Sequence, residues 1–236
     1  MKIAINFSPN FSKKIRKFKE IKFVIIHYTG MQSEIESVKR LKNQKAKVSC
    51  HYLINRKGQI FQMVKDKNIA WHAGKSKWKN YINLNKNSIG IELVNKGHQF
   101  GYQNFSKDQI KSLINLCKKL KKKYKIKTEN FLGHSDIAPL RKIDPGQKFP
   151  WKKLSKFKLG KWYSNRGKIS KSSFDQKLEK FFFKNIKKLG YRYFNFRKRS
   201  VRDKRIIKSF QMHYLPNKVT GIVDQKTLKI SQFLIN

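Results

Sequence analysis

Two histidines and one aspartate in the sequence could together bind a metal ion. His27 directly follows the apolar run 23–26, and His134 follows the stretch 131–133, so each would be held rigidly at the end of a strand. Asp144 stands ten residues after His134. Two imidazoles and one carboxylate leave the fourth position of a zinc ion open for water, which is typical of catalytic zinc sites. The spacing fits zinc but is weak evidence by itself, because single histidines more often have structural or solvated roles than catalytic ones.

A carboxylate inside an apolar segment is the second candidate for chemistry. Residues 88–94 are mostly apolar and predict a strand. Strict alternation places Glu92 on the same face as Gly90 and Val94, opposite Ile91. A buried carboxylate requires a partner or a chemical role. The alternative is that Glu92 belongs to an edge strand and faces water.

Strands and helices alternate around these residues. Capping-box patterns at Ser33 and Ser106 predict the starts of two helices. The first helix should place Ile35 and Leu41 on one side, and the second should bury Cys117 on its apolar side. The predicted strands comprise residues 21–26, 51–54, 59–64 and 88–94, with a hairpin turn at 55–58. This alternation indicates an α/β fold.

The residue composition of the chain changes after residue 151. Residues 152–173 are basic and contain Ser and Gly, which predicts a linker. The segment beyond carries three short helical patterns, at 174–189, at 201–212 and after Asp224. We therefore expect a catalytic domain over residues 1–165, with its core at 21–151, and a small three-helix domain over 166–236. A chain ending near Ser164 should then fold without the tail.

The composition argues against several classes of protein. With 57 Lys and Arg against 13 Asp and Glu, the 236-residue chain has a net charge of +44, and its 39% hydrophobic residues suffice for a packed core. The charge is spread over both parts and no zinc-finger or RNP-type motif occurs, so we expect no specific nucleic-acid partner. Genome composition or an anionic cell-wall partner explains the excess instead. No apolar run approaches the ~18 residues of a membrane span, and two cysteines exclude a disulfide scaffold.

Six segments of the chain, in family order, resemble the zinc-dependent N-acetylmuramoyl-L-alanine amidases of the amidase_2 family. They are residues 23–29, 49–54, 70–74, 87–92, 133–139 and 142–146. Phage-type members often have cysteine where this chain has Asp144. In having aspartate at this position, the chain resembles the AmiD- and AmpD-like branch of the family. The additional C-terminal part resembles the AmiD-like members most. The resemblance implies a mixed central sheet flanked by helices.

The resemblance also implies a role for each candidate residue. It makes His27, His134 and Asp144 the ligands of Zn2+, and Glu92 and Lys142 the catalytic polar pair. Zinc would polarise the amide carbonyl, Glu92 would transfer protons and Lys142 would stabilise the oxyanion. The implied reaction is hydrolysis of the amide bond between N-acetylmuramic or anhydro-muramic acid and L-alanine of the stem peptide, in cell-wall turnover or recycling.

Tyr28, Trp71 and His72 match segments that line the substrate cleft in this family. The tail resembles a three-helix peptidoglycan-binding domain at residues 207–211 and 219–224. The implied partner is peptidoglycan or a muropeptide, bound by a monomer, and the choice between sacculi and released anhydro-muropeptides stays open. A non-catalytic peptidoglycan-recognition protein is the alternative. The domain content favours the cell envelope or periplasm, whereas the lack of a recognisable signal peptide favours the cytoplasm.

Overall fold

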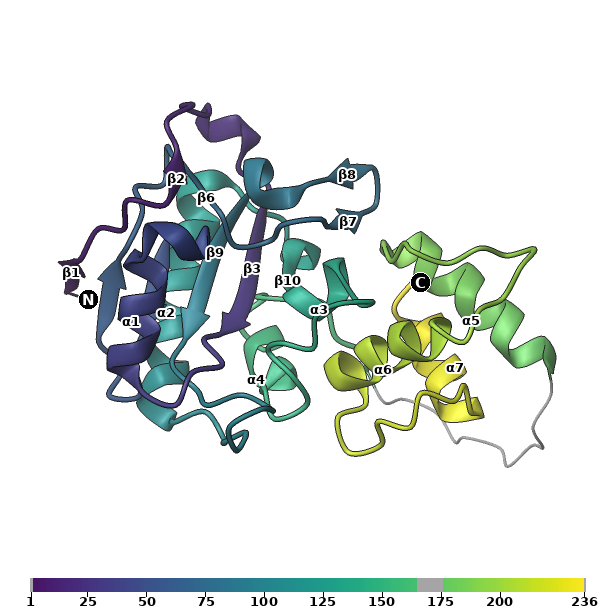
Figure 1. Cartoon of the computed structure of the whole chain (residues 1–236). Helices are drawn as coiled ribbons and strands as arrows, with labels where there is room; N and C mark the ends of the chain where they lie inside the picture. The colour runs from purple at the N-terminus through teal and green to yellow at the C-terminus, as the bar shows by residue number, and fades with distance from the viewer. Residues whose placement is uncertain (1, 165–175, 236) are drawn as a thin grey trace.

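The computed structural model describes residues 2–164 and 176–235, which form two neighbouring parts (Figure 1). The larger part is built around a six-stranded sheet, and the smaller part consists of three helices. The α-helices of the described residues are α1 (Glu34–Lys42), α2 (Lys107–Tyr124), α3 (His134–Ile137), α4 (Trp151–Ser155), α5 (Gln176–Leu189), α6 (Asp203–Tyr214) and α7 (Gln225–Phe233). Short 3₁₀ turns occur at Phe18–Glu20, Gln44–Ala46, Leu84–Asn87 and Thr128–Asn130. No helix in the described residues has the length and apolarity needed to span a membrane.

The central sheet is mixed, as the family resemblance implies. Its strand order is β1-β5-β4-β9-β3-β10. Strands β4 and β5 pair antiparallel and form the expected hairpin, whereas β3 lies parallel to both β9 and β10. The strands of the sheet are β1 (Ile3–Ile5), β3 (Phe23–Tyr28), β4 (Tyr52–Ile54), β5 (Ile60–Gln62), β9 (Ser88–Leu93) and β10 (Phe131–Gly133). Two small antiparallel pairs form separately, β2 (Phe11–Ser12) with β6 (Ile69–Ala70) and β7 (Lys77–Trp78) with β8 (Tyr81–Ile82).

One face of the sheet is covered by helix α2. Alternation turns Val24 and Ile26 of β3 toward this face, where they join Cys117 of α2 in one buried cluster. The side chain of Ser106 caps α2 by accepting a hydrogen bond from the backbone N–H of Gln109 at 3.1 Å. The predicted second helix and its buried thiol are therefore confirmed.

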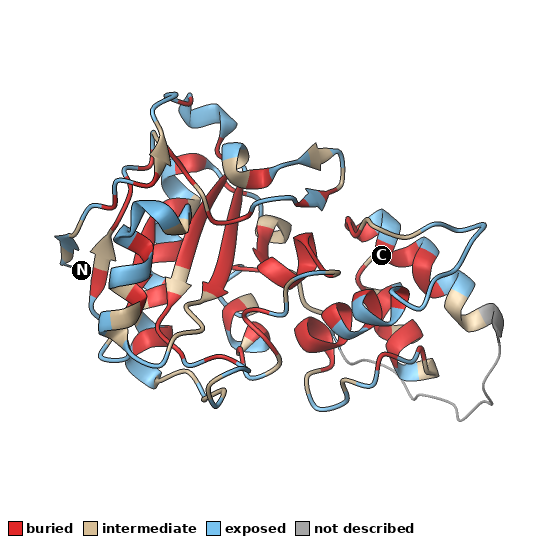
Figure 2. Cartoon of the chain, viewed as in Figure 1, coloured by how far each residue is buried: buried red, intermediate tan, exposed pale blue. Residues whose placement is uncertain are grey.

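The opposite face of β3 contributes to a buried cluster that continues into the helical part. Phe23 and Ile25 of β3 belong to the same buried cluster as Phe182 of α5 and Phe210 of α6. Figure 2 shows buried residues continuing from the sheet through α3 into these helices. The helical part therefore shares its apolar core with the sheet, a contact that the expectation of an independently folding tail did not include.

The predicted linker is wrong over its first part. Residues 151–155 form α4, and Leu154 and Leu159 are buried in the cluster beneath α2. The lysines between these apolar residues point outward, so a basic composition concealed an ordered segment. The remainder of the predicted linker, from 165 onward, lies outside the described residues.

Two apolar residues expected inside predicted helices are exposed. Ile35 is 67% exposed because α1 turns Ser37 and Leu41 to the interior instead. Val201 is 93% exposed and lies before the first residue of α6. The expected cap of the last helix is confirmed, since the Asp224 side chain accepts from the backbone N–H of Thr227 at 2.8 Å.

Candidate active site

The candidate ligands come together at one edge of the sheet. His27 lies near the carboxyl end of β3, and His134 begins α3 directly after β10. Asp144 follows in the loop after α3, and Glu92 stands opposite His27 in the register of β3 with β9. The carboxyl ends of neighbouring parallel strands meet at the same edge. Residues more than a hundred positions apart thereby become neighbours.

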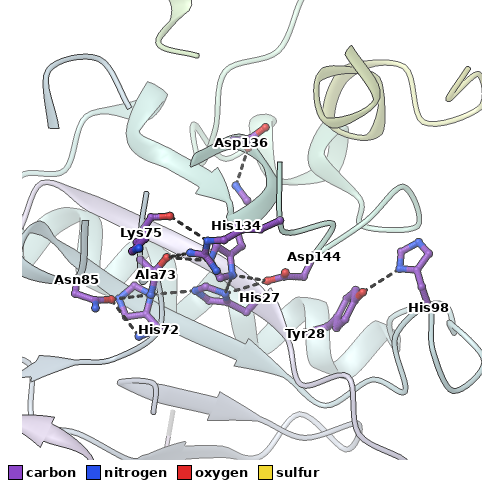
Figure 3. A network of polar contacts seen from close by, with 12 residues as sticks. His27, Tyr28, His72, Ala73, Lys75, Asn85, His98, His134, Asp136 and Asp144 are labelled. Atoms are coloured by element: carbon purple, nitrogen blue, oxygen red, sulfur yellow. Dashed lines mark hydrogen bonds and ion pairs between the residues drawn. The ribbon is translucent and has the colours of Figure 1, made fainter. Parts of the chain in front are cut away.

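Three donor atoms face one another in this site (Figure 3). The Nδ1 atoms of His27 and His134 lie 3.0 Å apart, and each lies 3.0 Å from Oδ2 of Asp144. All three side chains are buried. Within residues 2–164 and 176–235, they form a group of His, Cys, Asp or Glu side chains able to hold a metal ion. The separations suit neighbouring ligands with the usual bond lengths of about 2.0–2.2 Å, so the site is compatible with a metal.

The protonation states of these side chains also suit metal binding. Burial, together with the nearby His134, lowers the pKa of His27 to about 4, although Asp144 opposes this effect. Burial alone would raise the pKa of Asp144, but attraction to His134 and hydrogen bonds with both histidines hold this pKa well below its ordinary range. At neutral pH His27 is therefore neutral and Asp144 is ionised, the forms that bind metals.

Glu92 lies beside this group and not at a sheet edge. Its strand β9 is flanked by β4 and β3, so the alternative of a solvent-facing edge strand is wrong. Among the described residues, its buried Oε2 atom has no hydrogen-bond partner. Burial and then the charge of Asp144 raise the pKa of Glu92 to about 8, while the charge of Lys142 opposes the rise. A carboxyl group in this state can take up and release a proton near neutral pH.

A cavity of about 610 Å³ opens over the site. Its lining includes all eight residues proposed from the sequence, namely His27, Tyr28, Trp71, His72, Glu92, His134, Lys142 and Asp144. Tyr28, Trp71 and Lys142 are partly exposed, so their side chains are accessible from the cavity. His72 differs because it is buried, with Nδ1 lying 3.0 Å from Nε2 of His27 and Nε2 lying 3.1 Å from the hydroxyl of Ser88.

Several contacts around the site were missed by the sequence analysis. The carbonyl of Ala73 accepts hydrogen bonds from Nε2 of His134, at 3.1 Å, and from the guanidinium of Arg141. The side-chain oxygen of Asn85 accepts from the backbone N–H groups of His72 and Ala73, at 3.1 and 2.6 Å. A backbone carbonyl gives no signal in the sequence. Asn85 is one of several asparagines in a polar stretch, so nothing in the sequence singles it out.

The helical part contacts the site from behind. Asp136, two residues after His134, is buried and accepts a hydrogen bond from the N–H of Gly133 at 2.7 Å. From the helical part, the hydroxyl of Tyr191 donates to Asp136, and Nδ1 of His213 lies 2.8 Å from its Oδ2. Helix α3, which begins with His134, is therefore held by side chains from both parts of the chain.

A mixed α/β sheet with a buried His-His-Asp group and an unpartnered glutamate beside a cavity is compatible with a hydrolase that uses a metal ion. The chain belongs to the Amidase_2 family, the N-acetylmuramoyl-L-alanine amidases, whose family model matches residues 17–147. The activity of the family is hydrolysis of the amide bond between N-acetylmuramic acid and L-alanine of peptidoglycan, so the predicted enzyme class is confirmed.

Individual relatives agree with this assignment. The chain is 34% identical to the N-acetylmuramoyl-L-alanine amidase AmiD of Escherichia coli, over 92% of this chain and 83% of that protein. It is 43% identical to the 1,6-anhydro-N-acetylmuramyl-L-alanine amidase AmpD of Haemophilus influenzae, over 45% of this chain and 56% of that protein.

Solved structures match the fold over nearly the whole chain. The complex of Escherichia coli AmiD with anhydro-N-acetylmuramic acid-L-Ala-D-gamma-Glu-L-Lys has a TM-score of 0.81 at 33% identity and covers 92% of this chain and 89% of that chain. Pseudomonas aeruginosa AmpDH3 in complex with anhydromuramic pentapeptide has a TM-score of 0.80 at 30% identity and covers 96% and 95% of the two chains. Both matches extend into the helical part, because they cover far more than residues 17–147.

Proposed function

We propose that this amidase requires zinc and that His27, His134 and Asp144 bind it. The observation that carries the proposal is the buried triangle of two Nδ1 atoms and one Oδ2 atom, each 3.0 Å from the others. Two imidazole nitrogens and one carboxylate oxygen suit zinc better than the harder cations Mg²⁺ and Ca²⁺, which prefer oxygen ligands. When bound, zinc would polarise the scissile carbonyl and make water nucleophilic near neutral pH.

Glu92 acts first as general base and then as general acid. Its carboxylate takes a proton from the attacking water and returns it to the L-alanine nitrogen as the amide bond breaks. The pKa of about 8 supports this role, because both protonation states are accessible near neutral pH. Lys142 stabilises the negative charge that develops on the carbonyl oxygen. Its charge already lowers the pKa values of Glu92 and His27, which supports a position near the reacting group.

The substrate is a muropeptide or the peptidoglycan from which it derives. Two similar proteins are described in complex with anhydro-muropeptides. The cavity of this chain is lined by Arg40, Arg141 and Lys142, whose charges suit the free carboxylates of stem peptides. Tyr28 and Trp71 add aromatic surface for contact with the sugar or the peptide.

The helical part is proposed to bind peptidoglycan, in a chain divided into a catalytic domain at 1–165 and a binding domain at 166–236. The support is the three-helix arrangement and a buried Gln211 in α6. The Gln211 side chain accepts from the N–H of Gly221 at 2.8 Å and donates to the carbonyl of Ile222 at 2.9 Å. These bonds fix the turn before α7, which belongs to the segment that resembles peptidoglycan-binding domains.

Mass spectrometry of reaction products tests the proposed function. The zinc-loaded full chain is incubated with purified anhydro-muropeptides and, separately, with intact sacculi. We expect stem peptides that begin with L-alanine, formed only with metal, so that a chelator stops the reaction and added zinc restores it. Release from muropeptides alone would assign the enzyme to recycling, and release from sacculi to wall turnover. Undiminished products from zinc-free protein, or cleavage within the stem peptide, would contradict the proposal.

A further inference from the structure

Each of the two histidines in the metal site has a second ring nitrogen that points away from it, and both of these atoms contact one short segment. Nε2 of His27 lies 3.0 Å from Nδ1 of His72, and Nε2 of His134 lies 3.1 Å from the carbonyl oxygen of Ala73. Figure 3 shows both contacts on the side of the two rings opposite Asp144. Two adjacent residues therefore contact both histidines from behind.

The direction of the hydrogen bonds in this region is fixed by a serine. The hydroxyl of Ser88 donates to the carbonyl of Leu84 at 2.6 Å, which leaves its oxygen to accept from Nε2–H of His72 at 3.1 Å. With that proton on Nε2, Nδ1 of His72 is an acceptor, and His27 donates to it through Nε2–H. The Nδ1 lone pair of His27 then faces the metal site.

The second histidine is fixed in the same tautomer by a backbone group. The carbonyl of Ala73 can only accept, so His134 donates to it through Nε2–H and keeps its Nδ1 lone pair for the metal site. Nη2 of Arg141 also lies 3.3 Å from this nitrogen, but it donates to the same carbonyl. Asn85 anchors the backbone N–H groups of both residues of the segment. Strand β9 leaves space for the His72 ring at Gly90, where a Cβ atom would lie 2.3 Å from Cγ of the histidine.

We propose that the His72–Ala73 segment is a positioning element that fixes the orientation and the metal-binding tautomer of both histidines. Ser88 sets the proton position on His72, and Asn85 holds the segment in place. The inference rests on the proposed zinc site and extends it by a second layer of residues. His72 then acts through His27, and both of its ring nitrogens are engaged within the protein, in contrast to the substrate contact that the family resemblance implies.

Zinc affinity of the full chain, measured by competition with a chromophoric chelator, is the readout. His72→Leu removes the acceptor for His27 and should weaken zinc binding by about 10–100-fold, the usual effect of such outer contacts. His72→Asn keeps an acceptor, because Oδ1 of asparagine is bonded to Cγ as Nδ1 of histidine is. The zinc affinity of this variant should stay within about threefold of the parent value. His98→Leu is the matched control, since His98 lines the same cavity but contacts Tyr28 and Gln147, and it should keep the parent affinity.

The outcomes separate positioning from packing. Parent-like zinc affinity in folded His72→Leu would overturn the proposal. Equal losses in the leucine and asparagine variants, or an equal loss in His98→Leu, would also overturn it, because general disturbance of the cavity would then explain the effect. If His72→Leu does not fold, Ser88→Ala decides, since loss of the hydroxyl acceptor frees the tautomer of His72 and should weaken zinc binding several-fold. A parent chain that binds no zinc would instead contradict the proposed function.

Discussion

Replacing Glu92 with glutamine should have opposite effects on catalysis and on stability. Glutamine keeps the shape of the side chain but cannot accept the proton of water, so turnover should fall by about 10²–10⁴-fold. Zinc should remain bound because Glu92 is outside the proposed ligand set. In the zinc-free protein the same change should stabilise the fold, since it removes a carboxyl group whose ionised form is disfavoured by burial and by Asp144.

The size of this stabilisation follows from the pKa of Glu92, which rises from an ordinary 4.5 to about 8. Below pH 4.5 the carboxyl group is protonated in both the folded and the unfolded chain. As the pH rises further, the unfolded chain ionises first, and the folded state loses about 1.4 kcal/mol of stability per pH unit until the folded carboxyl ionises near pH 8. At pH 7 the loss is about 3 kcal/mol, an upper value because the side chain borders an open cavity.

Denaturant unfolding of the zinc-free parent and of Glu92→Gln at pH 5 and pH 7 measures this difference. The variant should exceed the parent by less than about 1 kcal/mol at pH 5 and by up to about 3 kcal/mol at pH 7. Glu129→Gln, outside the cavity lining, is the control for removing one negative charge from this cationic chain. Equal stabilities of parent and Glu92→Gln at both pH values, or turnover of the variant within a few-fold of the parent, would refute the reasoning.

Three further changes test other parts of the molecule. His134→Ala removes one of three proposed ligands and should abolish stoichiometric zinc binding, and full zinc occupancy by elemental analysis would contradict the ligand assignment. Lys142→Met should lower kcat by about 10²–10³-fold with zinc content unchanged, whereas Lys152→Met, on the exposed side of α4, should leave kcat at the parent value. Truncation after Ser164 uncovers Trp78 and Trp151, whose buried rings pack against Tyr191 and His213 of the helical part. At about 1.5–3 kcal/mol for each large side chain, the loss is about 3–6 kcal/mol, which reaches the whole stability of many domains. Circular dichroism should then show an unfolded chain, and a folded, active truncated chain would restore the expectation of an independent tail.

The elements of this fold that depend on local signals could be predicted from the sequence. The caps at Ser33, Ser106 and Asp224 lie where their side chains can reach backbone N–H groups of the next turn. The packing of the tail against the larger part could not be predicted, because it depends on contacts such as that between Trp78 and Tyr191, which lie far apart in the sequence. Basic composition also concealed the ordered segment around α4.

In the candidate site too, some residues could be predicted from local sequence signals and others depended on tertiary contacts. His27 and His134 were indicated by their positions after apolar strands, and Glu92 by its place within one. Lys142 required the family resemblance, because a single lysine among 57 Lys and Arg residues gives no signal of its own. The carbonyl of Ala73 could not be predicted, since every residue has one and only tertiary structure selects which carbonyl meets an imidazole.

The shared core of the two parts has a consequence for folding during synthesis. Strands β3 and β10 emerge from the ribosome before the helices whose side chains join Phe23 and Ile25 in one buried cluster, and about 80 residues separate β10 from the end of α6. At synthesis rates of about 5–20 residues per second, this cluster stays incomplete for several seconds and is open to chaperones or to aggregation. Helix α3 lies at the same boundary, so Asp136, two residues after His134, gains its contacts with Tyr191 and His213 only after the C-terminal helices have docked.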